Sequence, residues 1–527
     1  MEDTLRCEAV AAAAHRSREI VAVEVRRPHQ EVSFPVSLIA DSFSSPVRPV
    51  LRGRVGAVSA AHPLAVAAGQ EMLLAGGTAA DAAIAAQAIL CVVMPDACGL
   101  GGDMLALVHL PGHTQTAING TGAAPSVLKQ VSDDGPNSIT VPGIVDAWCR
   151  LSKHHGRLPL SRVLDPAVRL ARSGMRVSQS LAAALTTHRD RLERGGAAAW
   201  PLFAARAGAS IPQEQLASAL QNIGADGRNA FYQGDAANAI VRAVQALGGT
   251  LAETDLAAHE TIVATPVETA WDEWRLATQP PMAQGVLLNM SVQALSRFGE
   301  LPTALNDHVA IELTNAAFAF RADVAEGAAL LSNELAIDLK KASHRGGPRA
   351  YLHTAGVAAV DAEGMVISSL VSVFDDFGSC VFVPELGFTL NNRAAGFTYG
   401  ANAAAPGKRP VHTLAPTLLS TPQGVLALAT PGADGQVQTL LQVLVAITRE
   451  KMDLAQAIAR PRWRSENGAL LIERSHSGIE RLAALGHRVK PLADGDVRFG
   501  AIVCAGWIDD EPVSAADWRR YTAAGVV

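Results

Sequence analysis

Thr354 is the residue whose chemical type and position most clearly suggest catalysis. It follows His353 and opens the run "AGVAAVD" (355–361), whose small and apolar residues are typical of a β-strand. A threonine at such a position can cut its own precursor: its hydroxyl attacks the preceding carbonyl, an acyl shift from nitrogen to oxygen gives an ester, and water releases a new N-terminus. The freed α-amine, with a pKa of about 7.7–8.0, then accepts the hydroxyl proton at neutral pH. Threonine is also common in strands, so the local sequence leaves an ordinary structural role open.

Thr354 lies where the predicted secondary structure changes from helices to strands. Residues 60–345 read mainly as helices, including two alanine-rich helices separated at Gly76-Gly77. After residue 350 the pattern changes to strands, expected at 355–361, 365–373, 380–384, 386–391 and 425–430, with helices at 435–450 and 453–460 and short strands near the C-terminus. In the first of these strands, Ala358 and Val360 should face away from Val357 and Ala359.

Other motifs argue against cofactors and metals. Gly99, Gly101 and Gly102 open a strand rather than a helix, and no Lys-Ser/Thr pair follows, so we expect a turn that requires positive φ rather than a phosphate site. His154 and His155 are adjacent and would face different directions on a helix, which disfavours a shared metal. The six cysteines are scattered and form no CxxC motif, so we expect free thiols. We predict no cofactor and no metal site.

Composition excludes several classes of protein. A net charge of −6 gives no basic field for a nucleic acid, so no nucleic-acid partner is expected. No apolar run of about 18 residues is present, so no membrane span is predicted. Residues 1–55 are expected to be a loosely ordered extension or an over-extended reading frame, and they lack the pattern of a secretion signal. A cytoplasmic location is the resulting expectation.

A series of motifs resembles the γ-glutamyltranspeptidase family, in the family's own order. The series begins with "GGTAADAA" and the glycine loop before "DMLALV" and ends at the C-terminal segments; its members are 76–108, 141–174, 231–259, 279–285, 353–369, 377–392, 412–419 and 429–439. In this series Thr354 occupies the place of the family's nucleophile, seven residues before Asp361. The resemblance runs from about Val55 to the C-terminus.

The resemblance implies an α/β fold of the four-layer αββα N-terminal-nucleophile hydrolase type. Cleavage at His353–Thr354 would give an α-rich large subunit, 56–353 behind the extension, and a β-rich small subunit, 354–527. The two would remain together as a heterodimer, with any further association left open. Ser372 stands where the family has a hydroxyl that hydrogen-bonds the nucleophile. The N–H groups of Gly432 and Ala433 match the glycine pair of the family's oxyanion hole.

The substrate positions depart from those of a γ-glutamyl enzyme. A γ-glutamyl group carries an α-carboxylate and an α-ammonium, which a selective site must pair with opposite charges. Thr121 replaces the family's carboxylate-binding arginine, and Gly396 replaces the aspartate that holds the ammonium. Phe374 replaces an asparagine and His412 replaces a serine. These changes argue against γ-glutamyl transfer as the native reaction.

Arg393 lies in the same loop and adds a positive charge at a position where the family usually has a glutamine. A planar guanidinium suits a carboxylate, so we expect a small amide substrate with one carboxylate and no amine. The segments that contain Arg393 and His412 resemble those of the oxamate amidohydrolase branch of the family, which acts in purine and allantoin breakdown. On that interpretation Thr354 converts oxamate to oxalate and ammonia, with Arg393 and His412 binding the carboxylate; the remaining substrate-binding candidates are Asn392, Thr413 and Thr121. Arg393 and His412 could equally have structural roles.

Two other functions stay open at this point. One is a γ-glutamyltransferase or glutathione hydrolase with redesigned anchors. The other is an uncleaved, inactive homologue that serves as a binding protein.

Overall fold

The computed structural model describes residues 47–343, 345 and 354–527. His353 and residues 1–46 of the predicted extension lie outside the described residues. Within the remainder of that extension, Arg48 donates hydrogen bonds to the carbonyls of Asp517 and Thr522, and Leu51–Arg52 forms strand β1, which pairs with β20 (Glu511–Ala516). The folded body therefore already includes residues that we had assigned to the extension.

Two seven-stranded antiparallel sheets form the centre of the structure. The first sheet has, in spatial order, β1, β20 (Glu511–Ala516), β19 (Val503–Ile508), β15 (Gly424–Ala429), β14 (Thr417–Thr421), β9 (Trp274–Thr278) and β8 (Val267–Trp271). The second has β21 (Ala523–Val526), β2 (Gly56–Ala60), β10 (Ala355–Asp361), β11 (Val366–Ser372), β3 (Asp103–His109), β4 (Thr116–Gly120) and β7 (Ile262–Ala264). Smaller sheets are β5 (Met175–Arg176) with β6 (Ser210–Ile211), β12 (Phe382–Val383) with β13 (Phe388–Thr389), and β16 (Trp463–Glu466) with β17 (Ala469–Glu473) and β18 (Val489–Leu492).

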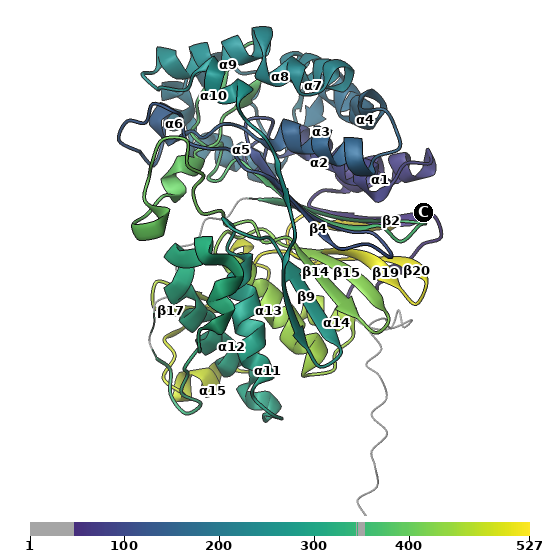
Figure 1. Cartoon of the computed structure of the whole chain (residues 1–527), viewed down its shortest axis with the longest axis vertical. Helices are drawn as coiled ribbons and strands as arrows, with labels where there is room; N and C mark the ends of the chain where they lie inside the picture. Colours follow the sequence, from purple (N-terminus) through teal and green to yellow (C-terminus); the bar gives the residue numbers. More distant parts are fainter. Residues whose placement is uncertain (1–46, 344, 346–353) are drawn as a thin grey trace, which may run out of the picture. The chain divides into compact units, whose positions relative to one another are not determined.

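Helices cover the outer face of each sheet. On the outer side of the second sheet, α1 (Pro63–Leu74), α2 (Ala79–Val93) and α3 (Ile144–His155) pack against its strands. The further helices on this side are α4 (Leu160–Ser173), α5 (Gln179–Thr187), α6 (Arg189–Arg194), α7 (Glu214–Asp226), α8 (Asn229–Tyr232), α9 (Gly234–Ala246) and α10 (Glu253–Ala257). The first sheet is covered by α11 (Gly285–Ser296), α12 (Thr303–Ala317), a 3₁₀ segment (Phe318–Ser332), α13 (Gly435–Thr448), α14 (Leu454–Ala459) and α15 (Ile479–Ala484). Figure 1 shows α1 and α2 on one side of the strands and α11, α12 and α13 on the other.

Three apolar cores follow from this arrangement, one under each helical layer and one between the sheets. Strand β10 contributes to two of them. Val357 and Ala359 lie in the core under α1 and α2, whereas Ala358 and Val360 lie between the sheets. The predicted alternation of β10 is therefore confirmed, and so is the four-layer αββα fold.

The N-terminus of α2 is tied to the far end of β10. Thr78 caps α2 and forms a capping box with Asp81, whose carboxylate accepts the N–H of Thr78. Asp361 Oδ2 accepts the N–H of Ala79 at 2.9 Å, and its Oδ1 accepts the N–H of Met365 in the turn to β11. Asp361 thus holds β10, the β10–β11 turn and α2 in one register.

The glycine loop before β3 differs from the prediction. Gly101 and Gly102 do not have positive φ. They are required by close approach, because a Cβ at Gly101 would lie 2.2 Å from the carbonyl oxygen of Thr389, and one at Gly102 would lie 2.4 Å from that of Ser372. The loop therefore lets the start of β3 press against β11 and β13.

The sequence reading also missed strands β8, β9 and β14. The sequence predicts mainly helices over residues 60–345, yet β8 and β9 form a hairpin at the edge of the first sheet. Its two-residue turn contains Asp272 at φ +47°, a conformation that aspartate tolerates. Alternation on either side of that turn was the signal that could have revealed the hairpin.

Candidate active site

Four strands of the second sheet bring a row of polar side chains to one end of the space between the sheets. Strand β10 pairs with β11 so that Ala355 faces Val371, which places Thr354 opposite Ser372. Ser372 is paired in turn with Asp103 on β3, and the β3–β4 register continues to Thr121 just past the end of β4. All four are at most 2% exposed. Neighbouring antiparallel strands lie about 4.8 Å apart, so Thr354 and Asp103 are about 10 Å apart along this row.

Thr354 contacts the residue that the sequence proposed as its partner. The Thr354 hydroxyl donates to Ser372 Oγ at 3.5 Å, at the long limit for a hydrogen bond. Ser372 Oγ also accepts the N–H of Phe374 at 2.9 Å, which orients its lone pairs. Phe374 adopts φ +85°, a rare conformation for a bulky residue, so the chain bends sharply immediately after the row.

The predicted oxyanion pair lies in the loop between β15 and α13. A Cβ at Gly356 would touch Ala429 at the end of β15, so the start of β10 lies against the strand that leads into this loop. Gly432 has φ +124° and Ala433 φ +48°, and within the described chain neither N–H has a hydrogen-bond acceptor. Left-handed backbone at a non-glycine residue costs about 1 kcal/mol or more and is often found at functional sites. Two adjacent donors held in this way suit an oxyanion.

Neighbouring side chains hold the carbonyls of the same loop. Gln284 Nε2 donates to the carbonyl of Ala433 at 2.9 Å and to that of Thr413 at 2.6 Å. Arg464 donates to the carbonyl of Gly432 at 3.1 Å. A carbonyl shares its peptide plane with the next N–H along the chain, so the contact to the Gly432 carbonyl fixes the direction of the Ala433 N–H, and the contact to the Ala433 carbonyl fixes that of Asp434.

Asp103 joins the row to the two residues proposed to bind substrate. Its Oδ2 lies 3.3 Å from Arg393 Nε and 3.2 Å from His412 Nε2, and its Oδ1 accepts the N–H of Gly122 at 3.3 Å. Asp103 and Arg393 are fully buried and His412 is 1% exposed. Sequence reasoning did not select Asp103, because its role depends on pairing between strands that are distant in the chain.

The protonation states in this cluster follow from burial. Burial lowers the pKa of Arg393 to about 10, against the raising effect of Asp103, so the guanidinium is charged at neutral pH. Burial and then the Arg393 cation lower the pKa of His412 to about 4, so the imidazole is neutral. His412 Nδ1 accepts the N–H of Leu414 at 3.2 Å, which leaves the proton on Nε2 to donate to Asp103.

Arg393 has spare hydrogen-bonding capacity. Its guanidinium stacks on the ring of Phe374 at 4.2 Å from the centroid, and Asp103 occupies only its Nε edge. Both terminal nitrogens are buried, and neither has a partner in the described part of the chain. Buried guanidinium N–H groups are normally paired, so the free edge marks a place where an anionic ligand would be stabilised.

The remaining predicted residues have mainly structural contacts. Asn392 donates to Asp375 Oδ2 and to the carbonyl of Asp133, while its Oδ1 accepts the N–H of Asp375. The Thr121 hydroxyl donates to Asn119 Oδ1 at 2.7 Å. Gly396 accepts a bond from Asn402 on its carbonyl and provides no charge. The cluster therefore contains a cation for a carboxylate but no carboxylate at the position that would hold an ammonium.

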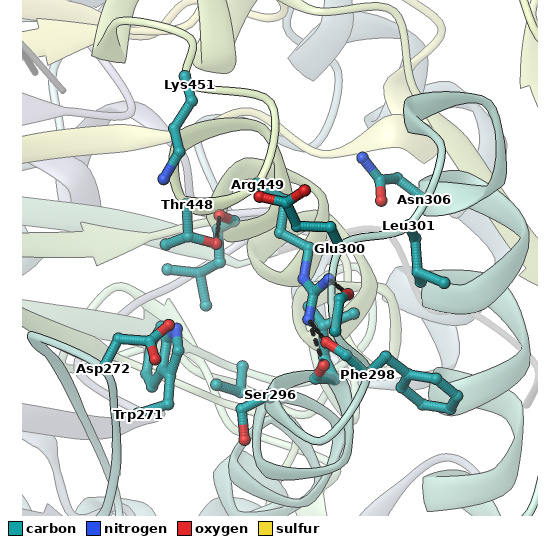
Figure 2. Close-up of a pocket in the computed structure, with 14 residues that line it drawn as sticks. Trp271, Asp272, Ser296, Phe298, Glu300, Leu301, Asn306, Thr448, Arg449 and Lys451 are labelled. Atoms are coloured by element: carbon teal, nitrogen blue, oxygen red, sulfur yellow. Dashed lines mark hydrogen bonds between the residues drawn. The ribbon is translucent and has the colours of Figure 1, made fainter. Parts of the chain in front are cut away.

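A pocket of about 460 Å³ lies elsewhere, beside the ends of α11 and α13. Figure 2 shows Arg449 in this pocket with its guanidinium directed at backbone carbonyls of the segment that ends α11, where it donates to Gly299 and Phe298. None of the predicted site residues lines this pocket. Arg449 thus provides hydrogen-bond donors for carbonyls at the end of α11, which is a structural role.

Comparison with known proteins identifies the family of this chain. The sequence profile described as Gamma-glutamyltranspeptidase matches residues 65–527. The chain belongs to this family. It is 31% identical to the oxamate amidohydrolase proenzyme of Klebsiella pneumoniae, over 84% of this chain and 93% of that protein. It is 30% identical to the glutathione hydrolase-like YwrD proenzyme of Bacillus subtilis, over 83% and 92% of the two chains.

The comparison with solved structures finds the same fold in a known enzyme. The crystal structure of cephalosporin acylase from Bacillus halodurans superposes with a TM-score of 0.81 at 27% identity, covering 93% of this chain and 99% of that one. The predicted enzyme class, a γ-glutamyltranspeptidase-like hydrolase acting on amide C–N bonds, is confirmed by the family match. Among the described residues, no helix is both long and apolar enough to cross a membrane.

Proposed function

We propose that this protein is a self-cleaving amidohydrolase with Thr354 as nucleophile, acting on a small amide that carries a carboxylate. Oxamate is the substrate that fits best. The observation that carries the substrate proposal is the buried Arg393 guanidinium, with two unpaired nitrogens in the described chain, joined through Asp103 to the row that contains Thr354.

Activation begins with cleavage of the His353–Thr354 bond. The Thr354 hydroxyl attacks the carbonyl of His353, the acyl group moves from nitrogen to oxygen, and water hydrolyses the ester to free the α-amine. The products would be residues 1–353 and 354–527. Because β10 is paired on both sides and buried, the two pieces would stay together as a heterodimer. Both named relatives are proenzymes, which supports this step.

In turnover the α-amine takes the proton from the Thr354 hydroxyl, which attacks the amide carbon of the substrate. The developing oxyanion would lie against the N–H groups of Gly432 and Ala433. The α-ammonium returns this proton to the leaving nitrogen, so neutral ammonia leaves and an acyl ester on Thr354 remains. Water, activated by the same amine, then attacks the ester to release the dicarboxylate and the free hydroxyl. Ser372 positions the hydroxyl through the 3.5 Å contact.

Specificity would come from the free edge of Arg393. A carboxylate can accept two parallel N–H bonds there, with the guanidinium held flat by Phe374 and Asp103. Neutral His412 shapes the same site and adds no charge. Thr121 and Gly396 provide neither the cation nor the anion that a glutamate backbone requires, so this site favours a monocarboxylate amide over a γ-glutamyl group. This proposal connects the enzyme to nitrogen release in purine breakdown.

A glutathione hydrolase is the second candidate, favoured by the similarity to the Bacillus subtilis protein. An uncleaved binding protein is the third. We also propose a cytoplasmic location, supported by the free thiols of Cys91, Cys98, Cys149, Cys380 and Cys504.

Two assays separate these functions. Gel electrophoresis of the purified protein should show two fragments, and a single intact band with Thr354 unmodified would support the binding protein instead. Ammonia release from oxamate is then compared with p-nitroaniline release from a γ-glutamyl anilide. Turnover of the anilide with none of oxamate would contradict the proposed substrate while leaving the nucleophile in place.

A further inference from the structure

Two histidines and a glutamate meet between α12 and the loop that precedes β18. His308 and Glu312 are one turn apart on α12, so both side chains lie on the same face of the helix. His487 approaches from the loop between α15 and β18. One ligand atom from each of the three lies within 4.8 Å of the others. His308 and Glu312 are buried, and His487 is half-buried.

The orientation of His308 suits a metal ligand. Its Nε2 lies 2.8 Å from the carbonyl oxygen of Asp338, which can only accept, so the proton of a neutral imidazole lies on Nε2. Nδ1 therefore presents a lone pair, and it lies 2.8 Å from His487 Nε2. A ring N–H donated to a backbone carbonyl is the usual support of a metal-binding histidine, because it fixes the tautomer and the ring plane.

A fourth candidate ligand and a small space lie beside the cluster. Asn315, on the next turn of α12, is 6% exposed, and its Oδ1 has no hydrogen-bond partner in the described chain. Glu312, Asn315 and His487 line one cavity of about 20 Å³. This is about the space that one water molecule or one small ion occupies.

We propose that His308, Glu312, His487 and Asn315 form a structural site for a divalent transition metal, with Zn²⁺ as the best fit. Two imidazoles with carboxylate and amide oxygens are a ligand set that zinc accepts in tetrahedral geometry. At zinc–nitrogen distances of about 2.0–2.1 Å, two nitrogen ligands lie roughly 3.3 Å apart, so His487 needs to retreat by only about 0.5 Å. In the same step His487 moves its proton from Nε2 to Nδ1, and both imidazoles stay neutral.

The charges around the cavity are compatible with a cation. Arg345 and Arg488 also line it, but both are exposed, so water screens them. Arg345 is further engaged with the carbonyl of Ala336. The Glu312 carboxylate is the buried charge in the cluster and accepts the N–H of Ser343 at 3.1 Å. A metal here would join α12 to the loop before β18, independently of the Thr354 chemistry.

The test uses the full-length protein without an affinity tag, stripped with a chelator and titrated with ZnCl₂ by calorimetry. We expect one Zn²⁺ per chain, a higher thermal unfolding midpoint with zinc, and a visible absorption band of tetrahedral type with Co²⁺. His487→Ala and Glu312→Gln should each weaken binding by ~100-fold or more, since even supporting groups of metal sites change affinity by ~10–100-fold.

The matched control removes a pair of histidines that is not part of the proposed zinc site. His154→Ala/His155→Ala changes an adjacent pair at the end of α3 and should leave zinc binding unchanged. Circular dichroism of each variant without metal shows whether it folds. If His487→Ala does not fold, Glu312→Gln is the test variant, because glutamine has nearly the same size and shape as glutamate. The proposal would be overturned if the wild type did not bind zinc stoichiometrically. It would also be overturned if Glu312→Gln bound zinc as tightly as the wild type, or if the control variant lost zinc binding.

Discussion

The free edge of Arg393 leads to a quantitative prediction for substrate choice. In Arg393→Met the side chain keeps its apolar stem but loses the two nitrogens offered to a carboxylate. A hydrogen bond to a charged group contributes about 1.5–3 kcal/mol, so two such bonds are worth about 3 kcal/mol at the lower limit. That energy corresponds to a ~100-fold fall in kcat/KM.

The assay compares oxamate with oxamide, its neutral isostere. Wild-type enzyme should prefer oxamate, and Arg393→Met should lose this preference mainly through KM, because the carboxylate contact is present before and during the chemical step. Arg393→Lys keeps a charge without the planar fork and should fall between the two, with a ~10-fold loss. Release of ammonia from each substrate is the measurement.

Stability must be followed in parallel, because Arg393 also compensates the buried Asp103. Breaking a fully buried ion pair costs about 3–5 kcal/mol, so Arg393→Met should unfold at lower urea concentration. Arg228→Met is the matched control: it removes an arginine from its pair with Asp146, where no proposed substrate contact exists, and should keep the preference for oxamate. Self-cleavage should continue in all three variants.

Two results would refute this reasoning. If Arg393→Met folds and cleaves itself but still prefers oxamate, the guanidinium does not bind the carboxylate. If self-cleavage fails in Arg393→Lys as well as in Arg393→Met, Arg393 is a structural residue whose free nitrogens have no ligand.

Three further predictions concern the nucleophile, the oxyanion loop and acid stability. Thr354→Ala should remain a single chain on a gel and Thr354→Ser should still cleave, since only a hydroxyl can make the ester; cleavage of the alanine variant would place the nucleophile elsewhere. Ala433→Gly relieves a left-handed residue at φ +48° and should raise the free energy of unfolding by about 0.5–1 kcal/mol in a urea titration, whereas a loss would show that Ala433 is not strained. The pKa of His412 is about 4 in the folded protein against about 6.5 unfolded, so the unfolded state takes up the proton first and stability is lost as pH falls through that window. His412→Gln should therefore lose about 2–3 kcal/mol less than wild type between pH 7.5 and 4.5, and an equal loss would contradict the shift.

Local patterns in the sequence were sufficient to predict the strand that carries the proposed nucleophile. The alternation of β10 and the capping box of α2 depend on neighbours within a few residues, so both are visible without a fold. The order of motifs then identified the family and with it the αββα layers. Where strands were short and polar on one face, as in β8 and β9, the same local reasoning read them as helix.

The tertiary structure decided what surrounds Thr354, the proposed nucleophile. Asp103 becomes the centre of the site only because β3 pairs with β11, and this pairing joins segments of the chain that are far apart in sequence. Likewise, only the packed structure shows that Arg393 is buried on Phe374 with two nitrogens left over, because burial is a property of the whole fold. The sequence by itself determined which chemistry the chain could perform at Thr354. Strand pairing and burial decided which charged residues lie near Thr354. Both depend on contacts between residues that are far apart in the sequence, so neither can be seen in the sequence alone.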